Sequence, residues 1–192
     1  MKIGIFGGSF NPLHNGHVNA ALEVLKYTDL EEIWFMPCIK NVMKESENHI
    51  DAKQRIEMLE LSLSKYPELK VSDFEIKNEI RYTADTVPAV KKEFPKHEFY
   101  LVLGSGLAEE FHKWKEPQKI LDEIKIIIVP MPDMPNLTDK ALIEHKPLII
   151  EKAKRIDISS TKVRNYVKEG KSISELVPSE IEEYIMKKRL YL

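Results

Sequence analysis

The stretch Gly7-Gly8-Ser9-Phe10-Asn11-Pro12-Leu13-His14-Asn15-Gly16-His17 lies between a short apolar run and an amphipathic run. The apolar run, residues 3–6, predicts a buried strand, and the amphipathic run predicts a helix that reaches about Lys26, with Asn15 as its N-cap. Two adjacent glycines let the backbone approach a ligand closely, and the hydroxyl of Ser9 follows them. The free N–H groups of the first helical turn would point at the same place, which favours a phosphate site.

Two histidines make this turn more specific than an ordinary glycine-rich turn. His14 and His17 are three residues apart, so they share one face if both lie in the first helical turn. Taken singly, each histidine fits a structural role equally well. Neither Gly-x-x-x-x-Gly-Lys-Ser/Thr nor Gly-x-Gly-x-x-Gly is present here, so two common phosphate loops are excluded.

A second group of polar residues lies near the other end of the chain, in Ile158-Ser159-Ser160-Thr161-Lys162-Val163-Arg164. A hydroxyl at the start of a helix caps it, and Gly170 would end that helix. Capping accounts for one serine, whereas three hydroxyls together with Arg164 provide side-chain donors and a guanidinium beside free backbone N–H groups. Alone, the stretch would also fit an ordinary capped helix with a surface arginine; together with the first stretch it predicts a second phosphate cradle.

Both stretches resemble the signatures of the nucleotidylyltransferase superfamily, in the order in which that superfamily has them. The first resembles Gly-Ser-Phe-Asp-Pro-x-His-x-Gly-His, with Asn11 in place of the common Asp, and the second resembles Ile-Ser-Ser-Thr-x-Val-Arg. The resemblance implies a Rossmann-like α/β fold, that is, a doubly wound parallel sheet. It implies that His14, His17 and Arg164 are catalytic. It also implies an ATP site made by Gly7, Gly8, Ser9, Phe10, Gly104, Ile158, Ser159, Ser160 and Thr161.

Further blocks are similar to the nicotinate-nucleotide adenylyltransferase family and cover nearly the whole chain. These are Met36-Pro37 with Lys44, the helix after Asp51, the run 81–86, Leu103-Gly104 with Trp114, and the ending Val177-Pro178, Tyr184-Ile185 and Leu190-Tyr191. By this resemblance the acceptor nucleotide would be bound by Lys44, Thr83, Thr86 and Trp114, with Trp114 stacking near the pyridine ring. Without it, Trp114 would be assigned to packing and Lys44 to a solvated loop.

The resemblance implies transfer of AMP from ATP to nicotinate mononucleotide, giving nicotinate adenine dinucleotide and pyrophosphate. Mg²⁺ would arrive with ATP, since no dedicated carboxylate cluster for a metal is evident. Two alternatives stay open: another acceptor, such as nicotinamide mononucleotide or phosphopantetheine, and a non-catalytic nucleotide-binding regulatory module.

The chain departs from the family pattern at two places. The family commonly has Gly-x-Asp after its fourth strand, where this chain has Gly104-Ser105-Gly106. The family also commonly has an arginine near the position of Val129-Pro130. We expect a weakened or altered acceptor preference as a consequence.

The rest of the sequence predicts alternating strands and helices, as in a doubly wound parallel sheet. Strands are expected at residues 3–6, 32–37, 99–103, 124–129, 148–150 and 155–158, with a further alternating segment at 70–77. Helices are expected after Asn15, Asp51, Tyr82 and Ser159, with Pro88 in the first turn of the third, and a weak helix at 141–144.

Composition limits the class of protein. The chain has 192 residues, 43% of them hydrophobic, so we expect a single domain over residues 1–192. The net charge of −2, with both signs interspersed, argues against nucleic acid or membrane partners. One cysteine, Cys38, excludes an internal disulfide, and with no signal-peptide pattern or membrane-length apolar run we expect a cytoplasmic protein. A homo-oligomer stays open.

Overall fold

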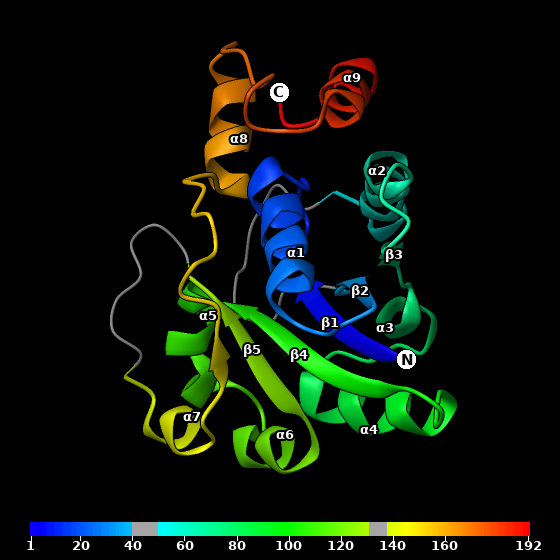
Figure 1. Cartoon of the computed structure of the whole chain (residues 1–192). Helices are drawn as coiled ribbons and strands as arrows, with labels where there is room; N and C mark the ends of the chain where they lie inside the picture. The colour runs from blue at the N-terminus through cyan, green and yellow to red at the C-terminus, as the bar shows by residue number, and fades with distance from the viewer. Residues whose placement is uncertain (40–49, 131–137) are drawn as a thin grey trace.

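In the described part of the chain, six parallel strands form one sheet, in the order β3-β2-β1-β4-β5-β6 (Figure 1). The computed structural model describes residues 1–39, 50–130 and 138–192. The strands are β1 (Lys2–Gly8), β2 (Glu32–Pro37), β3 (Leu69–Val71), β4 (Glu98–Gly104), β5 (Lys125–Val129) and β6 (Leu148–Ile149). The chain runs outward from β1 to β3 and then returns to the other side of β1 with β4. At such a reversal the carboxyl ends of the two central strands leave a crevice for ligands.

Helices connect the strands and extend the chain beyond the sheet. They are α1 (Asn15–Tyr27), α2 (Ala52–Leu63), α3 (Phe74–Lys77), α4 (Thr83–Glu93), α5 (Ser105–Glu109), the 3-10 helix η1 (Phe111–Lys113), α6 (Pro117–Glu123), α7 (Lys140–Glu144), α8 (Ser160–Lys168) and α9 (Ser179–Lys188). None of the described helices is long and apolar enough to span a membrane.

Helices cover both faces of the sheet (Figure 1). On one face, α1 and α2 pack on side chains such as Phe35 of β2 and Val102 of β4. On the other face, α4 and α6 pack on side chains such as Ile5 of β1 and Leu101 of β4. Because neighbouring residues of a strand point to opposite faces, strands buried on both sides are apolar throughout. The predicted doubly wound α/β fold is therefore confirmed.

The last two helices, α8 and α9, lie beyond α1 and α2 rather than on the sheet (Figure 1). Their apolar side chains form a third cluster with Met58 of α2, and Val163 and Ile185 are fully buried in it. This cluster holds the second signature against the helix layer that carries the first.

Two segments differ from their predicted structure. The alternating segment 70–77 is a strand only at Leu69–Val71; Phe74–Lys77 forms a helical turn that buries both Phe74 and Glu75. Residues 155–158 pair with no described strand: the Ile158 N–H donates to the Ile156 carbonyl (3.0 Å) in a tight turn, and both isoleucines pack into the third cluster. Alternation over so few residues fits any extended or turning segment that buries every second side chain.

Candidate active site

The glycine-rich stretch forms the turn between β1 and α1. After Gly8 the backbone passes through Phe10, which has a φ of 47° in the left-handed region. The helix begins at Asn15 with His14 as its N-cap, so the predicted cap at Asn15 is wrong. Asn15 is engaged elsewhere: its backbone N–H donates to the Leu176 carbonyl (2.9 Å) and its side chain to the Glu175 carbonyl (3.0 Å).

His14 and His17 lie together at the start of α1, as their spacing predicts. Their rings are stacked, with centroids 3.6 Å apart and planes 23° apart, and the backbone N–H of His14 donates to Nδ1 of His17 (3.3 Å). Gly16 makes room for this arrangement, since a Cβ at that position would lie 3.0 Å from Nδ1 of His14. The spacing His-x-Gly-His thus has a steric cause.

Burial keeps both imidazoles neutral near pH 7 in the free protein. Burial lowers the pKa of His14, which is 3% exposed, to about 4. The pKa of His17 is lowered well below its usual value, first by burial and then by the charge of His14. In the described part of the chain, Nδ1 of His14 has no hydrogen-bond partner. A bound phosphate would favour the protonated forms and supply the partner.

The second signature contacts the first directly. The Ser160 hydroxyl donates to the Pro12 carbonyl (2.8 Å), across 148 positions of the chain. Arg164 donates to the Asn11 carbonyl (2.7 Å) and to the Thr161 hydroxyl (3.2 Å). The two predicted phosphate-binding stretches therefore meet at the N-termini of α1 and α8, whereas Gly104, also predicted for the ATP site, ends β4.

These contacts change what α8 can offer a ligand. The hydroxyl of Ser159 caps α8 by accepting from the Lys162 N–H (3.2 Å), and the hydrogen of the Ser160 hydroxyl is already donated. What remains toward a phosphate is the set of free backbone N–H groups at the start of α8, the hydroxyl hydrogens of Ser159 and Thr161, and the other N–H groups of Arg164. Ile158 is buried immediately before this turn.

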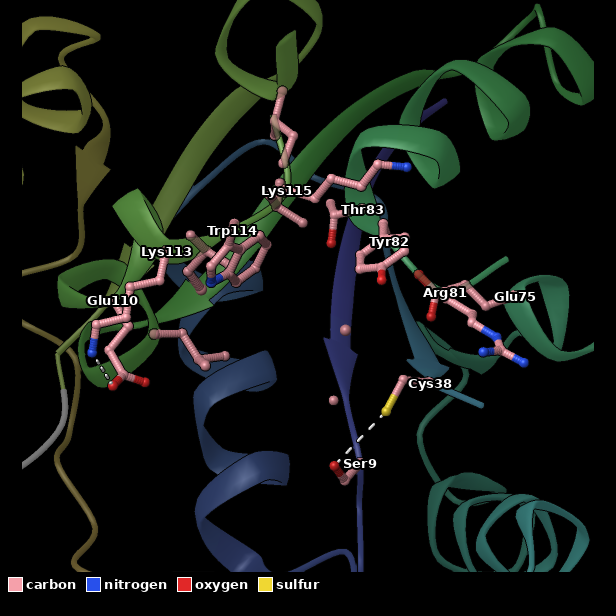
Figure 2. A pocket seen from close by; sticks show the side chains of 16 residues that line it. Ser9, Cys38, Glu75, Arg81, Tyr82, Thr83, Glu110, Lys113, Trp114 and Lys115 are labelled. Atoms are coloured by element: carbon pink, nitrogen blue, oxygen red, sulfur yellow. Dashed lines mark hydrogen bonds and ion pairs between the residues drawn. The ribbon is translucent and has the colours of Figure 1, made fainter. Parts of the chain in front are cut away.

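A cavity of about 460 Å³ lies at the carboxyl ends of β1 and β4 (Figure 2). Figure 2 shows Trp114 on one side, Tyr82 and Thr83 on the other, and Ser9 and Cys38 at one end. The lining consists of Gly7, Gly8, Ser9, Cys38, Glu75, Arg81, Tyr82, Thr83, Leu101, Leu103, Leu107, Glu110, Lys113, Trp114, Lys115 and Ile120. The cavity has the size and mixed lining of a small-molecule site.

The predicted acceptor residues are distributed unevenly around this cavity. Thr83 and Trp114 line it, and the indole also packs on Phe111, with ring centroids 5.2 Å apart. Thr86 does not line it: its buried hydroxyl donates to Oε1 of Glu75 (2.7 Å). Lys44 lies outside the described residues.

Comparison with known proteins agrees with this geometry. The family model described as cytidylyltransferase-like matches residues 5–166. The chain is 35% identical to nicotinate-nucleotide adenylyltransferase of Bacillus subtilis over 191 residues, which is 99% of this chain and 98% of that protein. It is 36% identical to the probable nicotinate-nucleotide adenylyltransferase of Bacillus licheniformis over 191 residues, again 99% and 98% of the two chains. The chain belongs to the nicotinate-nucleotide adenylyltransferase family.

A solved structure shares the fold of this adenylyltransferase. It is the nicotinic acid mononucleotide adenylyltransferase of Plasmodium falciparum, described as complexed with NaAD. The TM-score is 0.80 at 24% identity, over 99% of this chain and 97% of the other.

Two buried charged residues of the adenylyltransferase were missed by the sequence reasoning. Glu75 is 9% exposed in the cavity wall, where burial raises its pKa despite the hydrogen bond from Thr86. Arg55 is 1% exposed and donates to three carbonyls, those of Ser9 (2.8 Å), Cys38 (2.7 Å) and Ile39 (3.0 Å). One signal existed for Arg55: it falls on the buried face of α2, one helical turn before Met58 and Leu59.

The departures from the family pattern lie at the end of β4 and β5. Gly104 is paired in register with Val129, and Gly106 lies in the first turn of α5, where an added Cβ would meet no atom within 4 Å. Within residues 1–39, 50–130 and 138–192, no group of three or more His, Cys, Asp or Glu side chains is arranged to hold a metal ion.

Proposed function

We propose that this enzyme transfers the adenylyl group of ATP to nicotinate mononucleotide, giving nicotinate adenine dinucleotide and pyrophosphate in NAD biosynthesis. Full-length relatives carry the name of this activity. The observation that carries the proposal is the contact between the two signatures. It brings two helix N-termini and two stacked histidines together beside a cavity of nucleotide size.

The chemistry requires positioning more than proton transfer. The attacking atom is a phosphate oxygen of the mononucleotide, which is ionised at neutral pH and needs no general base. The enzyme must bring two anions into line and stabilise charge on the α-phosphate and on the leaving pyrophosphate. Helix N-termini, neutral imidazoles that gain a proton or donate a hydrogen bond, and a guanidinium suit this task.

We assign His17 to the α-phosphate in the transition state and His14 to the triphosphate. The free backbone N–H groups of residues 159–161 would bind the β- and γ-phosphates, and Arg164 would reach the leaving end. The backbone of residues 7–10, which are Gly7, Gly8, Ser9 and Phe10, would lie against the phosphates. Mg²⁺ would come with ATP and be held by phosphate oxygens and water, because carboxylates are not gathered there among the described residues.

The acceptor would occupy the cavity, with its pyridine ring on Trp114 and Thr83 on the opposite wall. Thr86 would act indirectly, because its hydroxyl donates a hydrogen bond to the carboxyl group of Glu75, which lines the cavity. Lys44 stays a predicted contact of the acceptor. We further propose that residues 1–192 act as one nucleotidylyltransferase domain in the cytoplasm, with small-molecule substrates as partners.

An acceptor panel tests the proposal. Pyrophosphate release from ATP and Mg²⁺ would be measured with nicotinate mononucleotide, nicotinamide mononucleotide and phosphopantetheine. We expect the fastest release with nicotinate mononucleotide. Faster release with another acceptor would identify that acceptor as the substrate instead of nicotinate mononucleotide. No release with any of them would support the non-catalytic alternative.

A further inference from the structure

The turn that carries the first signature is strained. Phe10 has a φ of 47°, in the left-handed region that side chains with a Cβ rarely adopt. Its ring is nearly fully buried, at 2% exposure, and lies 5.1 Å from the ring of His17. Such a conformation persists only where the surroundings fix it from several directions. The position of the His17 ring therefore depends on what holds the turn.

Among the described residues, three side chains from distant parts of the chain hold the residues on either side of Phe10. Arg55 donates to the carbonyl before it, that of Ser9, and Arg164 donates to the carbonyl after it, that of Asn11. The third bond comes from the last residues of the chain, where the Tyr191 hydroxyl donates to Oδ1 of Asn11 (2.7 Å).

The end of the chain is shaped to deliver this hydroxyl. After α9 the backbone turns through Arg189 and Tyr191, both with positive φ (54° and 63°), and Leu190 donates back to the Ile185 carbonyl (3.0 Å). Leu190 and Tyr191 pack against the third apolar cluster. Burial raises the pKa of Tyr191, so the hydroxyl keeps its proton and can donate at any working pH.

We propose that Tyr191 is a positioning residue for adenylyl transfer: through Asn11 it fixes the strained Phe10 turn and thereby the orientation of His17. The side chain touches neither the cavity nor the histidines in the described structure, so its effect passes through Asn11. A misplacement of catalytic groups by about 1 Å can lower a rate by about 10². Loss of this hydrogen bond to Asn11 should therefore lower turnover measurably without unfolding the chain.

The test compares two tyrosines of the C-terminal region. Tyr191→Phe removes the hydroxyl that holds Asn11. Tyr184→Phe is the matched control, since its hydroxyl donates to Oε2 of Glu57 (2.5 Å), away from the turn. Two readouts are needed: kcat and KM with ATP and nicotinate mononucleotide, and the NMR resonance of the His17 ring C–H in the ligand-free protein.

For Tyr191→Phe we expect kcat about tenfold below wild type, both KM values within about threefold, and a shifted His17 resonance. For Tyr184→Phe we expect wild-type kcat and His17 resonance. Equal kcat in the two variants, or an unshifted His17 resonance in Tyr191→Phe, would overturn the proposal.

A double-mutant cycle tests whether the effect passes through Asn11. In an Asn11→Ala background, Tyr191→Phe should lower kcat no further, whereas a further tenfold loss would contradict the proposed route. Asn11→Asp keeps an oxygen acceptor and should keep the response to Tyr191→Phe. The kcat and KM measurements depend on the proposed function, whereas the NMR resonance of the His17 ring in the ligand-free protein does not. A wild-type protein inactive with these substrates would refute the function and leave the His17 readout to decide this inference.

Discussion

The phosphate-binding turns and the acceptor cavity are built in different ways. The turns at His14–His17 and residues 159–164 are tied together by named hydrogen bonds, and the His14 side chain between them is buried. The cavity is open and gathers side chains from many segments, from β1 to α6. Charge stabilisation at the reacting phosphate demands a fixed geometry, whereas recognition of the acceptor leaves room for substitution. The chemistry should therefore be more sensitive to mutation than acceptor binding.

The largest effect is expected in the phosphate-binding turns. His17→Ala should fold normally and lose turnover by about 10² or more, because one preorganised donor to the developing charge is removed. Steady-state kinetics with thermal unfolding as the control for folding would measure it. Near wild-type turnover in the folded variant would remove His17 from the mechanism.

The next effect is expected at the altered end of β4. Gly106→Asp should bind the nucleotide sugar more than tenfold more tightly. A charge-assisted hydrogen bond contributes about 1.5 to 3 kcal/mol, and an added Cβ would meet no atom within 4 Å. Titration calorimetry with nicotinate mononucleotide and a non-hydrolysable ATP analogue would measure it.

Gly106→Ala is the matched control, because it adds the Cβ without the carboxylate. If neither ligand binds more tightly to folded Gly106→Asp than to Gly106→Ala, then the missing acid does not limit binding.

A smaller and more selective effect is expected for Trp114→Ala. The KM for the acceptor should rise about tenfold, whereas the KM for ATP should change little, since the indole serves the pyridine ring. Trp34→Ala is a useful control, because Trp34 packs on Phe94 and Phe99 outside the cavity and should lower Tm rather than change either KM. An equal rise in both KM values for Trp114→Ala would make this residue structural.

The smallest effect concerns stability against pH. The folded-state pKa of His14, about 4, lies below its usual value of 6.5, so the unfolded chain binds more protons between these values. The contribution of neutral His14 to the free energy of unfolding is therefore fully present above about pH 6.5 and is lost as the pH falls toward 4. Between pH 7.5 and 5.5, His14 should account for about 1 kcal/mol of lost stability. The lowered pKa of His17 acts in the same direction.

Urea unfolding at the two pH values, in wild type and in His14→Asn, would measure this share. The variant should lose about 1 kcal/mol less stability on acidification than wild type does. An identical loss in both proteins would show that His14 is not held neutral by burial.

The fold was predictable because its central strands are continuous apolar runs. Residues 101–103 and 126–129 are buried on both faces, and such runs have few alternatives. Short segments were ambiguous: 155–158 has the alternation of a strand, yet its buried side chains pack on helices. The polar turns were predictable because each signature is contiguous and its spacing has a local steric cause, as at Gly16.

Other parts of the site could not be predicted, because they depend on contacts between distant residues. Arg55 is buried only because the carbonyls of Ser9, Cys38 and Ile39 converge on it. Thr86 was predicted to contact the acceptor, but its hydroxyl faces Glu75, a partner that local sequence does not indicate. Such pairs form only when the tertiary structure brings the segments together.

The most direct test of the account is analysis of the products by mass. ATP, Mg²⁺ and nicotinate mononucleotide would be incubated with the wild-type chain and, in parallel, with His17→Ala, and the products separated and weighed. Wild type should form nicotinate adenine dinucleotide and pyrophosphate in equal amounts, and His17→Ala should form them at least about 10² more slowly. Hydrolysis of ATP without dinucleotide, or no reaction by wild type, would contradict the account.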